Sequence, residues 1–210
     1  MEFTTAITAF VALFVIIDPI GMAPLFVALT QGMTTRARRA IAFRACLVAF
    51  GLLTVFGLAG EALLNFLGVS MAAFRMAGGI LLFLTALDML FERRGPRRQG
   101  QADTVQSDAD RADDPSVFPL AIPLIAGPGS IATMILLAGA PGADAVYLLT
   151  IHGVMLTVIL CVLALFLLSG PLEKLLGPTG INVVTRLLGM LLAALSVQFV
   201  IDGLRDLQVI

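Results

Sequence analysis

Two short motifs hold the residues of this sequence best suited to binding a polar molecule, and each interrupts a long apolar stretch. The first reads Asp-Pro-Ile-Gly at 18–21, and the second reads Gly-Pro-Gly-Ser at 127–130. Proline inside a helix has no N–H to donate and pushes away the carbonyl one turn earlier. At membrane depth, backbone groups freed in this way are tolerated only where protein satisfies them or where they border a wet cavity. The motifs therefore predict two polar breaks in apolar surroundings.

Asp18 has the strongest chemistry in the first motif. An aspartate at the centre of a membrane helix opposes insertion by about 2.5–3.5 kcal/mol, whereas each Leu, Ile, Phe or Val favours it by about 0.3–0.6 kcal/mol. One interpretation of Asp18 is a ligand for a coupling ion or for a substrate amine. The other is a helix N-cap, because Asp followed by Pro is a preferred helix start. The two interpretations are compatible.

The second motif predicts a similar helix start at Gly127 and Pro128. Ser130 adds a hydroxyl, which we interpret either as a substrate contact or as a partner for the local backbone. Half-helix N-termini carry about half a positive charge each and suit a carboxylate, while unwound carbonyls suit a cation or an ammonium group. A zwitterionic amino acid presents both kinds of charge, so the pair of breaks favours this class of ligand.

The candidate site for substrate or coupling ion combines these motifs with nearby prolines and one glutamine. Gln198 lies within the last apolar run, where interhelical hydrogen bonding and ligand contact are both open. The coupling ion, if there is one, is H⁺ or Na⁺, and we expect no other cofactor and no metal site. The candidate residues are Asp18, Pro19, Gly21, Pro24, Pro123, Gly127, Pro128, Gly129, Ser130 and Gln198.

The composition places most of the chain in lipid. Hydrophobic residues make up 59% and charged residues 13%, against roughly 25% charged in ordinary soluble domains, and the mean hydropathy is +1.02. The net charge of −1 gives no reason to expect a nucleic-acid partner. Apolar runs of about 18 residues or more predict membrane helices. We expect an all-α membrane protein with six such helices, at 6–28, 41–60, 72–91, 118–137, 146–168 and 184–204.

The long polar stretch between the third and fourth runs divides the chain. We expect a first three-helix repeat at 1–91, a flexible linker at 92–117 and a second three-helix repeat at 118–210. Arginine and lysine concentrate in the 29–44 segment, the linker and the 169–186 segment. By the positive-inside rule both termini are then outside and the linker is cytoplasmic. With three helices per half, any repeat between the halves must be inverted, so helices 1 and 4 carry the corresponding breaks.

Three landmarks support the repeat. Pro19 aligns with Pro128 at an offset of 109 residues, Leu67-Gly68 with Leu176-Gly177 at the same offset, and Arg75 with Arg186 at 111. Matched broken segments in the two halves of a membrane chain point to a transporter binding site. Glycine and alanine stripes fit either packing within the chain or a homodimer.

The two Pro/Gly strings and the string Val-Gln-Phe-Val-Ile-Asp-Gly at 197–203 resemble the MarC family of integral membrane proteins. The resemblance covers nearly the whole chain, and the linker fits least. It implies a six-helix protein of the bacterial inner membrane, in a family commonly described as transporting small neutral amino acids. The substrate would exchange across the membrane by alternating access.

Two other functions remain open. A flippase or exporter for a lipophilic or phosphate-bearing molecule could use the same breaks, because helix N-termini bind phosphate. Against it, the two motifs contain Asp18 but no Lys or Arg, which anion sites usually use.

A membrane enzyme or thiol shuttle would need paired cysteines. Cys46 and Cys161 lie off the repeat offset and beside neither break, and no hydrolase or zinc motif occurs, so we expect no enzymatic activity.

Overall fold

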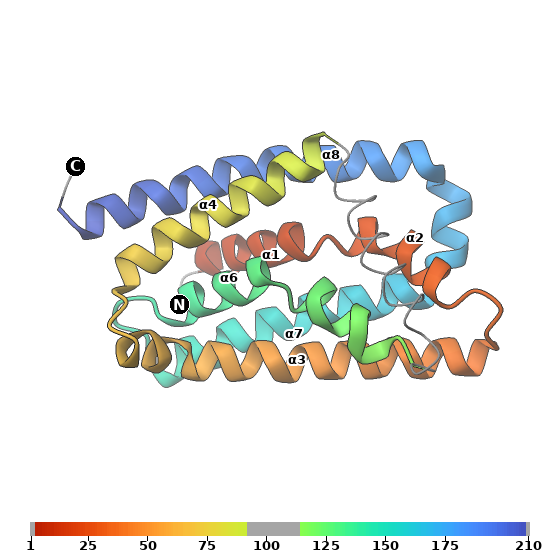
Figure 1. The fold of residues 1–210 in the computed structure, drawn as a ribbon, viewed down its shortest axis with the longest axis horizontal. Coiled ribbons are helices and arrows are strands. Elements are labelled where there is room, and N and C mark those ends of the chain that lie inside the picture. The colour runs from red at the N-terminus through yellow and green to blue at the C-terminus, as the bar shows by residue number, and fades with distance from the viewer. Residues whose placement is uncertain (1–2, 92–113, 209–210) are drawn as a thin grey trace.

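The computed structural model describes residues 3–91 and 114–208, and their regular structure consists of helices with no strand among them (Figure 1). This confirms the prediction of an all-helical protein. The elements in chain order are α1 (Phe3–Ile17), α2 (Pro19–Leu29), α3 (Thr35–Phe66), α4 (Met71–Leu90), η1 (Ser116–Ile125), α6 (Pro128–Ala138), α7 (Ala145–Leu167) and α8 (Ser169–Asp206).

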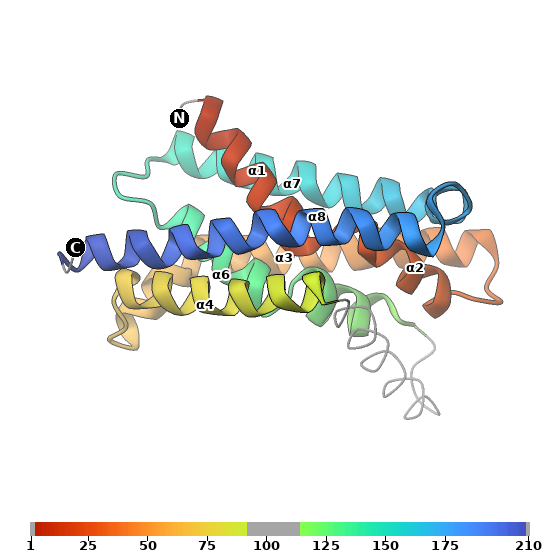
Figure 2. The same cartoon turned by 90° about the horizontal axis from the view of Figure 1, so that it is seen from above.

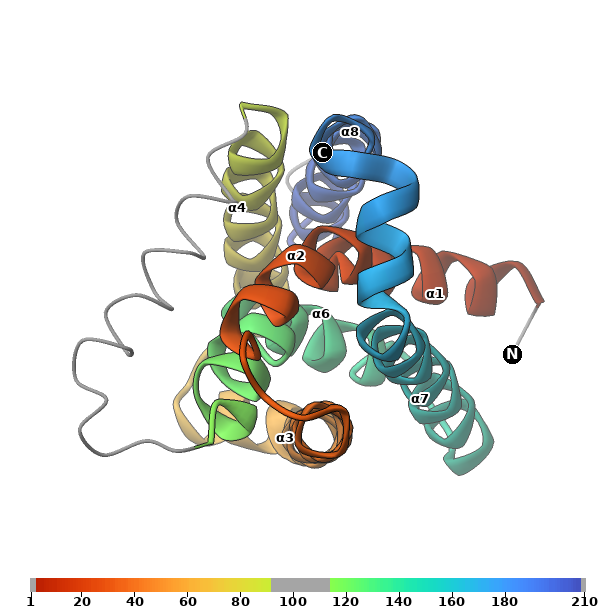
Figure 3. The same ribbon diagram turned by 90° about the vertical axis from the view of Figure 1, so that its right-hand side faces the viewer.

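Short helices occupy the middle of the bundle. Seen along its length, α2 and α6 lie among the long helices α3, α4, α7 and α8, while α1 enters from the side (Figure 3). From above, α8 runs alongside α4, and α1 crosses beneath α8 (Figure 2). The segments that carry the two sequence motifs therefore lie among the helices of the bundle, with Pro128 exposed.

Five segments are long and apolar enough to cross a membrane, and a sixth qualifies if η1 and α6 count as one span bent by 58°. The first of the five joins α1 and α2 into a stretch from Thr4 to Leu29. The bounds agree closely with the predicted runs at 6–28, 72–91 and 146–168. The chain is thus a multi-pass helical membrane protein.

Two segments expected to connect spans, 29–44 and 169–186, are helical over most of their length. The segment 29–44 was expected to precede a span at 41–60, but α3 begins at Thr35, capped by the hydroxyl of Thr34, and continues for 32 residues. At 1.5 Å per residue α3 is about 48 Å long, so it exceeds the roughly 30 Å hydrocarbon core. Arginine is a good helix former, and the first turns of α3 can extend beyond the apolar layer.

The second segment, 169–186, forms the first part of α8. The backbone of Gly177 has φ 61° and ψ 174°, which interrupts the helix and redirects it before Pro178. Figure 1 shows the first part of α8 crossing from the end of α7 to the line of α4. The membrane-crossing part runs from Gly177 to Asp206, starting earlier than the predicted 184–204.

Glycines allow α4 and α8 to pack closely, as the small-residue pattern predicts. A β-carbon on Gly79 would lie 2.7 Å from the carbonyl oxygen of Ser196, and one on Gly189 would lie 2.9 Å from Cβ of Met89. Without a side chain these positions let the helix backbones approach, which is how membrane helices associate where lipid gives no hydrophobic drive. Gly79 and Gly189 thus serve packing within one chain.

Helices of the two predicted halves pack against each other. From the first half, α1 contacts α7, and α2 contacts both α7 and α8. From the second half, η1 contacts α3, and α6 contacts both α3 and α4. The linker predicted at 92–117 lies largely outside the described residues. Within its described end, Asp114 forms an ion pair with Arg44 of α3. The N- and C-termini lie toward the same end of the bundle (Figure 1).

We call the opposite end, where α3 begins, the arginine end. Arg36, Arg38, Arg39 and Arg44 lie in the first three turns of α3. The end of α2 and the end of α7 lie at this same end (Figure 1). The end of α6, the end of α3 and the start of α7 lie at the other, which we call the terminal end.

Candidate functional site

The first break is a single residue, Asp18, between α1 and α2. Its N–H donates to the carbonyl of Phe14 (2.9 Å), and its own carbonyl accepts from the N–H of Met22 (3.1 Å), so its backbone belongs to both helices. Asp18 has φ 55° and ψ 64° and is 1% exposed. A non-glycine residue in this left-handed region costs of the order of 1–3 kcal/mol, and such residues cluster at active sites and ligand clamps; Asp is among the types enriched there.

The carboxylate of Asp18 caps α2. Its Oδ1 accepts a hydrogen bond from the N–H of Gly21 (3.1 Å), and Pro19 occupies the first helical position. A β-carbon on Gly21 would lie 2.8 Å from Cγ of Asp18 and closer still to Oδ2. Glycine is therefore needed because the carboxylate occupies the space of a side chain. The cap interpretation of Asp18 matches this geometry, and its role as a ligand stays a prediction.

The second break is longer and less regular. Pro119 and Pro123 have no N–H, so the usual ladder of bonds between residues four apart cannot form through η1. Bonds between residues five apart take its place, from Leu120 to Pro115 and from Ala126 to Ala121. The peptide bonds before both prolines are cis. A new helix, α6, begins at Pro128 with Gly127 as its N-cap.

Backbone carbonyl oxygens lie close to Gly127 and Ser130 at the second break. The position of a β-carbon on Gly127 is occupied by the carbonyl oxygen of Pro123, so glycine is again required by a close oxygen. The hydroxyl of Ser130 lies 2.7 Å from the carbonyl oxygen of Ile125 and 3.0 Å from that of Gly127, and it is 2% exposed. Of the two interpretations of Ser130, the backbone-partner one matches this geometry.

The second break contacts the helix that leads into the first break at Gly129. A β-carbon on Gly129 would lie 3.4 Å from Cγ2 of Ile16, two residues before Asp18, and 3.2 Å from Cδ2 of Leu82 on α4. The start of α6 therefore packs directly on the last turn of α1. The fold brings the helix turn just before the first motif against the second motif, although the two motifs lie more than 100 residues apart.

Other predicted residues lie farther from this junction. Pro24 is half-buried inside α2, Pro123 is half-buried in η1, and Pro128 is exposed. Gln198 is exposed on α8, and its Nε2 donates to Oδ1 of Asp202 one turn later (2.7 Å). The observed bond of Gln198 is thus within its own helix rather than between helices.

Thr133 is a residue of this region that the sequence interpretation missed. It lies on the same face of α6 as Gly129, one turn later, and it is 0% exposed. Its Oγ1 has no hydrogen-bond partner among the described residues. Four helical threonines bond back to the carbonyl four residues earlier: Thr8, Thr85, Thr150 and Thr157. Among the described residues, Thr54 and Thr185 share with Thr133 the lack of a partner. The spacing of four from a break glycine is the signal that could have identified Thr133.

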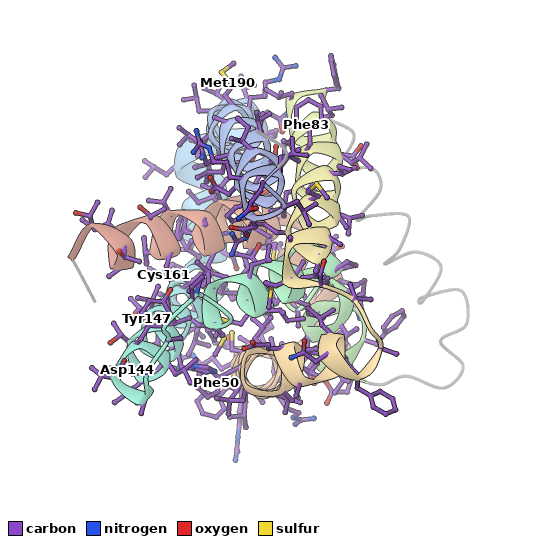
Figure 4. The ribbon with its side chains drawn as sticks, turned by 90° about the vertical axis from the view of Figure 1, so that its left-hand side faces the viewer. Phe50, Phe83, Asp144, Tyr147, Cys161 and Met190 are labelled. Atoms are coloured by element: carbon purple, nitrogen blue, oxygen red, sulfur yellow. The ribbon has the colours of Figure 1, made fainter. Side chains whose placement is uncertain are left out.

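Buried, unbonded hydroxyls are costly, by about 1–3 kcal/mol each. The Thr133 hydroxyl is therefore a feature that a polar ligand or a rearranged neighbour would satisfy. In contrast, side chains on the outside of the bundle are large and apolar. Met190 of α8 and Phe83 of α4 are 57% and 39% exposed and lie on the outer surface (Figure 4). The polar groups of the breaks are enclosed within an apolar exterior suited to lipid.

Comparison with known proteins gives a consistent set of relatives. A family model described as MarC family integral membrane protein matches residues 3–208. A UPF0056 membrane protein of Aquifex aeolicus is 38% identical over 209 residues, which cover 96% of this chain and 92% of the relative. The UPF0056 membrane protein YvbG of Bacillus subtilis is 34% identical, with 99% and 97% covered.

A third relative is the UPF0056 inner membrane protein YhgN of Escherichia coli, which is 36% identical with 95% of each chain covered. No solved structure matches the chain. The similarities include both breaks and the helices around them, since they extend over nearly the full length of this chain and of its relatives.

Proposed function

The chain belongs to the MarC family of integral membrane proteins, and we propose that it is a secondary transporter of small neutral amino acids. It works by alternating access around a site at the bilayer midplane, between the breaks at Asp18 and Gly127. The observation that carries this proposal is Asp18: a carboxylate, 1% exposed, in a left-handed conformation inside a multi-pass membrane protein. Ionisable residues inside membrane segments commonly mark substrate or ion pathways.

The proposed architecture has six spans in a 3+3 inverted repeat, with the first and fourth spans broken. Local geometry that recurs at a nearly constant offset supports it. The helices α2 and α6 each have 11 residues and each begin with proline. Gly32 and Gly142, 110 positions apart, have φ of 79° and 75°. Thr34 and Asp144, also 110 apart, each cap the helix that follows with a side-chain oxygen.

The same correspondence continues to the next bend. Gly68, which follows α3, and Gly177, which interrupts α8, are 109 positions apart and have φ of 72° and 61°. Under the repeat, α3 corresponds to α7 together with the first part of α8. Both termini are outside and the arginine end is cytoplasmic in this proposal, by the positive-inside rule. The membrane is the cytoplasmic membrane, and the name of the relative YhgN as an inner membrane protein supports this placement.

A zwitterionic substrate fits the charges that helix ends supply. The N-terminus of α6, which has no side-chain cap hydrogen bond, presents N–H groups and partial positive charge to a carboxylate. The C-terminal end of α1 and the carboxylate of Asp18 present negative charge to an ammonium group or to a coupling H⁺ or Na⁺. The segments 18–21 and 127–130 contain no Lys or Arg, which favours a ligand of zero net charge over a phosphate.

Thr133 supports a polar substrate in particular. Its buried hydroxyl has no partner among the described residues, so a substrate group that donates or accepts a hydrogen bond would recover about 0.5–1.5 kcal/mol. A purely lipophilic cargo would leave this hydroxyl unsatisfied. No enzymatic step is part of the proposal.

Counterflow in liposomes tests the proposed function. The purified protein is reconstituted with an unlabelled neutral amino acid inside, and uptake of the labelled amino acid is followed over a panel of glycine, alanine, serine, threonine and proline. Saturable exchange of at least one member is expected. The absence of exchange by folded protein across the panel would contradict the proposal.

The alternative function is a flippase or exporter of a phosphate-bearing lipophilic molecule, favoured by the two helix N-termini. Thermal unfolding in detergent distinguishes the two, because a ligand that binds the folded state raises its stability by an amount set by concentration and affinity. Stabilisation by neutral amino acids supports the transporter. Stabilisation by lipid phosphates alone supports the flippase.

A further inference from the structure

Two aromatic rings close the bundle between the first break and the arginine end. Phe26 lies on α2 seven residues after Pro19, so it lies on the same helix face two turns along. Its ring stacks on that of Phe166 of α7, with centroids 4.4 Å apart and planes at 7°. Both side chains are 1% exposed. Any path that follows this face of α2 from Asp18 toward the arginine end is blocked by this pair.

Arg38 of α3 contacts both the aromatic pair and the residues beside it. Its guanidinium carbon lies 5.7 Å from the centre of the Phe26 ring, within the range of a cation–π contact. Its Nη2 donates to Oγ of Ser169, at 3.4 Å. The hydroxyl of Ser169 in turn donates to the carbonyl of Phe166, at 2.8 Å. Arg38 thereby connects α2 and α3 to the junction of α7 and α8.

A different contact closes the terminal end. Ile135 lies on α6 seven residues after Pro128, the same spacing that separates Phe26 from Pro19. Ile135 packs directly on Gly60 of α3, where an added β-carbon would lie 3.0 Å from its Cδ1 and nearer to its Cγ1. Gly60 is buried, and Ile135 is 5% exposed. This contact is aliphatic and depends on the absence of a side chain at Gly60.

We infer that these two contacts are the gates of the transporter, that the structure holds both closed, and that Arg38 is the latch of the gate at the arginine end. The inference rests on the proposed function, because gates require a site between them. Release of Arg38 frees Phe26 to separate from Phe166 and opens the site toward the arginine end. Separation of Ile135 from Gly60 opens it toward the terminal end. Because the latch is a charged side chain, replacing Arg38 with an uncharged polar residue should affect the gate at the arginine end.

Accessibility of a cysteine placed between the break and the gate tests the latch. Met22 is 0% exposed and lies on the same face of α2 as Pro19 and Phe26. The reporter is Met22→Cys in a Cys46→Ser, Cys161→Ser background, reconstituted in liposomes and treated with a membrane-impermeant maleimide. A second reporter, Arg36→Cys, is exposed at the start of α3 and establishes which side of the membrane is labelled.

Arg38→Gln removes the cation–π contact and one charged hydrogen bond. Because of this loss, labelling of the cysteine at position 22 from the arginine side is expected to accelerate about tenfold. Arg39→Gln is the matched control, because Arg39 is an exposed neighbour on the same helix, and it should leave the rate unchanged. Gly60→Ala should accelerate labelling from the terminal side instead.

Equal labelling in Arg38→Gln and Arg39→Gln, with both proteins folded by gel filtration and melting temperature, would overturn the inference. Acceleration from both sides by either variant would overturn it as well, because that result indicates general loosening. The labelling assay needs no substrate. A failure of the gates is therefore distinguishable from a failure of amino-acid counterflow by the wild-type protein.

Discussion

The carboxylate of Asp18 lies against the backbone of Gly21 where a side chain would otherwise project. Oδ1 of Asp18 accepts from the Gly21 N–H at 3.1 Å, and its Cγ lies 2.8 Å from the position of a Gly21 β-carbon. The cap of α2, the left-handed turn at Asp18 and the identity of Gly21 are thus one arrangement. It fixes the only acidic group of the two motifs at the end of α1.

Gly21→Ala should disturb this arrangement directly. The added methyl group cannot coexist with the carboxylate, so the cap bond breaks or α2 shifts, and unfolding should become easier by about 1–3 kcal/mol. Gly51→Ala is the control, because its β-carbon meets nothing within 4 Å and alanine favours a helix. Melting temperature and counterflow check both variants. A Gly21→Ala protein as stable and active as Gly51→Ala would contradict the account.

At the second break, Gly127→Ala and Gly129→Ala should differ in severity. The β-carbon at Gly127 meets the backbone carbonyl of Pro123, which cannot move without reshaping η1. At Gly129 it meets Cδ2 of Leu82 at 3.2 Å, which can shift slightly, and Cγ2 of Ile16 at 3.4 Å, which is an ordinary contact. We expect a large loss of folded protein for Gly127→Ala and little loss for Gly129→Ala, measured by yield and thermal unfolding. A larger loss of folded protein for Gly129→Ala than for Gly127→Ala would contradict the close contact between Gly127 and the Pro123 carbonyl.

Much of this fold could be predicted from sequence, because the constraints are local. Apolar length determined the spans at 72–91 and 146–168, and proline with its N-cap determined where α2 and α6 begin. The family resemblance drawn from the two Pro/Gly strings and the 197–203 string was also correct. The helical continuation of α3 through its arginines was missed, because charge predicts the edge of the lipid but not the end of a helix.

The partners of the breaks could not be predicted in the same way. Nothing in the sequence distinguishes Arg38 from Arg36 and Arg39, since only packing places its guanidinium on Phe26. The roles of Gly21 and Gly127 likewise depend on packing. In the structure the left-handed residue is Asp18, and the two glycines make room for oxygen atoms.

Thr133→Val should separate a ligand-binding hydroxyl from an inert one. Valine has nearly the same shape and removes the unbonded group, so the melting temperature should hold or rise. If the hydroxyl contacts substrate, KM for counterflow should rise about tenfold, equivalent to about 1.4 kcal/mol, and Thr133→Ser should restore it. Thr157→Val, at an exposed threonine bonded to its own helix, serves as the comparison. An unchanged KM in Thr133→Val would remove Thr133 from the site.

Replacement of both cysteines should leave transport intact. Cys46 is buried in α3 and Cys161 lies on α7, and both are free. Neither takes part in the breaks, so the Cys46→Ser, Cys161→Ser protein should retain at least half of wild-type counterflow. Loss of activity with retained folding would instead revive a thiol-based function.

The most direct test of the central claim is counterflow by Asp18→Asn. Asparagine can still accept the Gly21 N–H bond and tolerates the left-handed conformation, so the cap and the fold should survive while the charge is lost. We predict wild-type levels of folded protein in the membrane and loss of exchange of at least 100-fold relative to wild type, roughly 2.7 kcal/mol. Normal, ion-coupled exchange by the folded Asp18→Asn protein would contradict the account and reduce Asp18 to a helix cap.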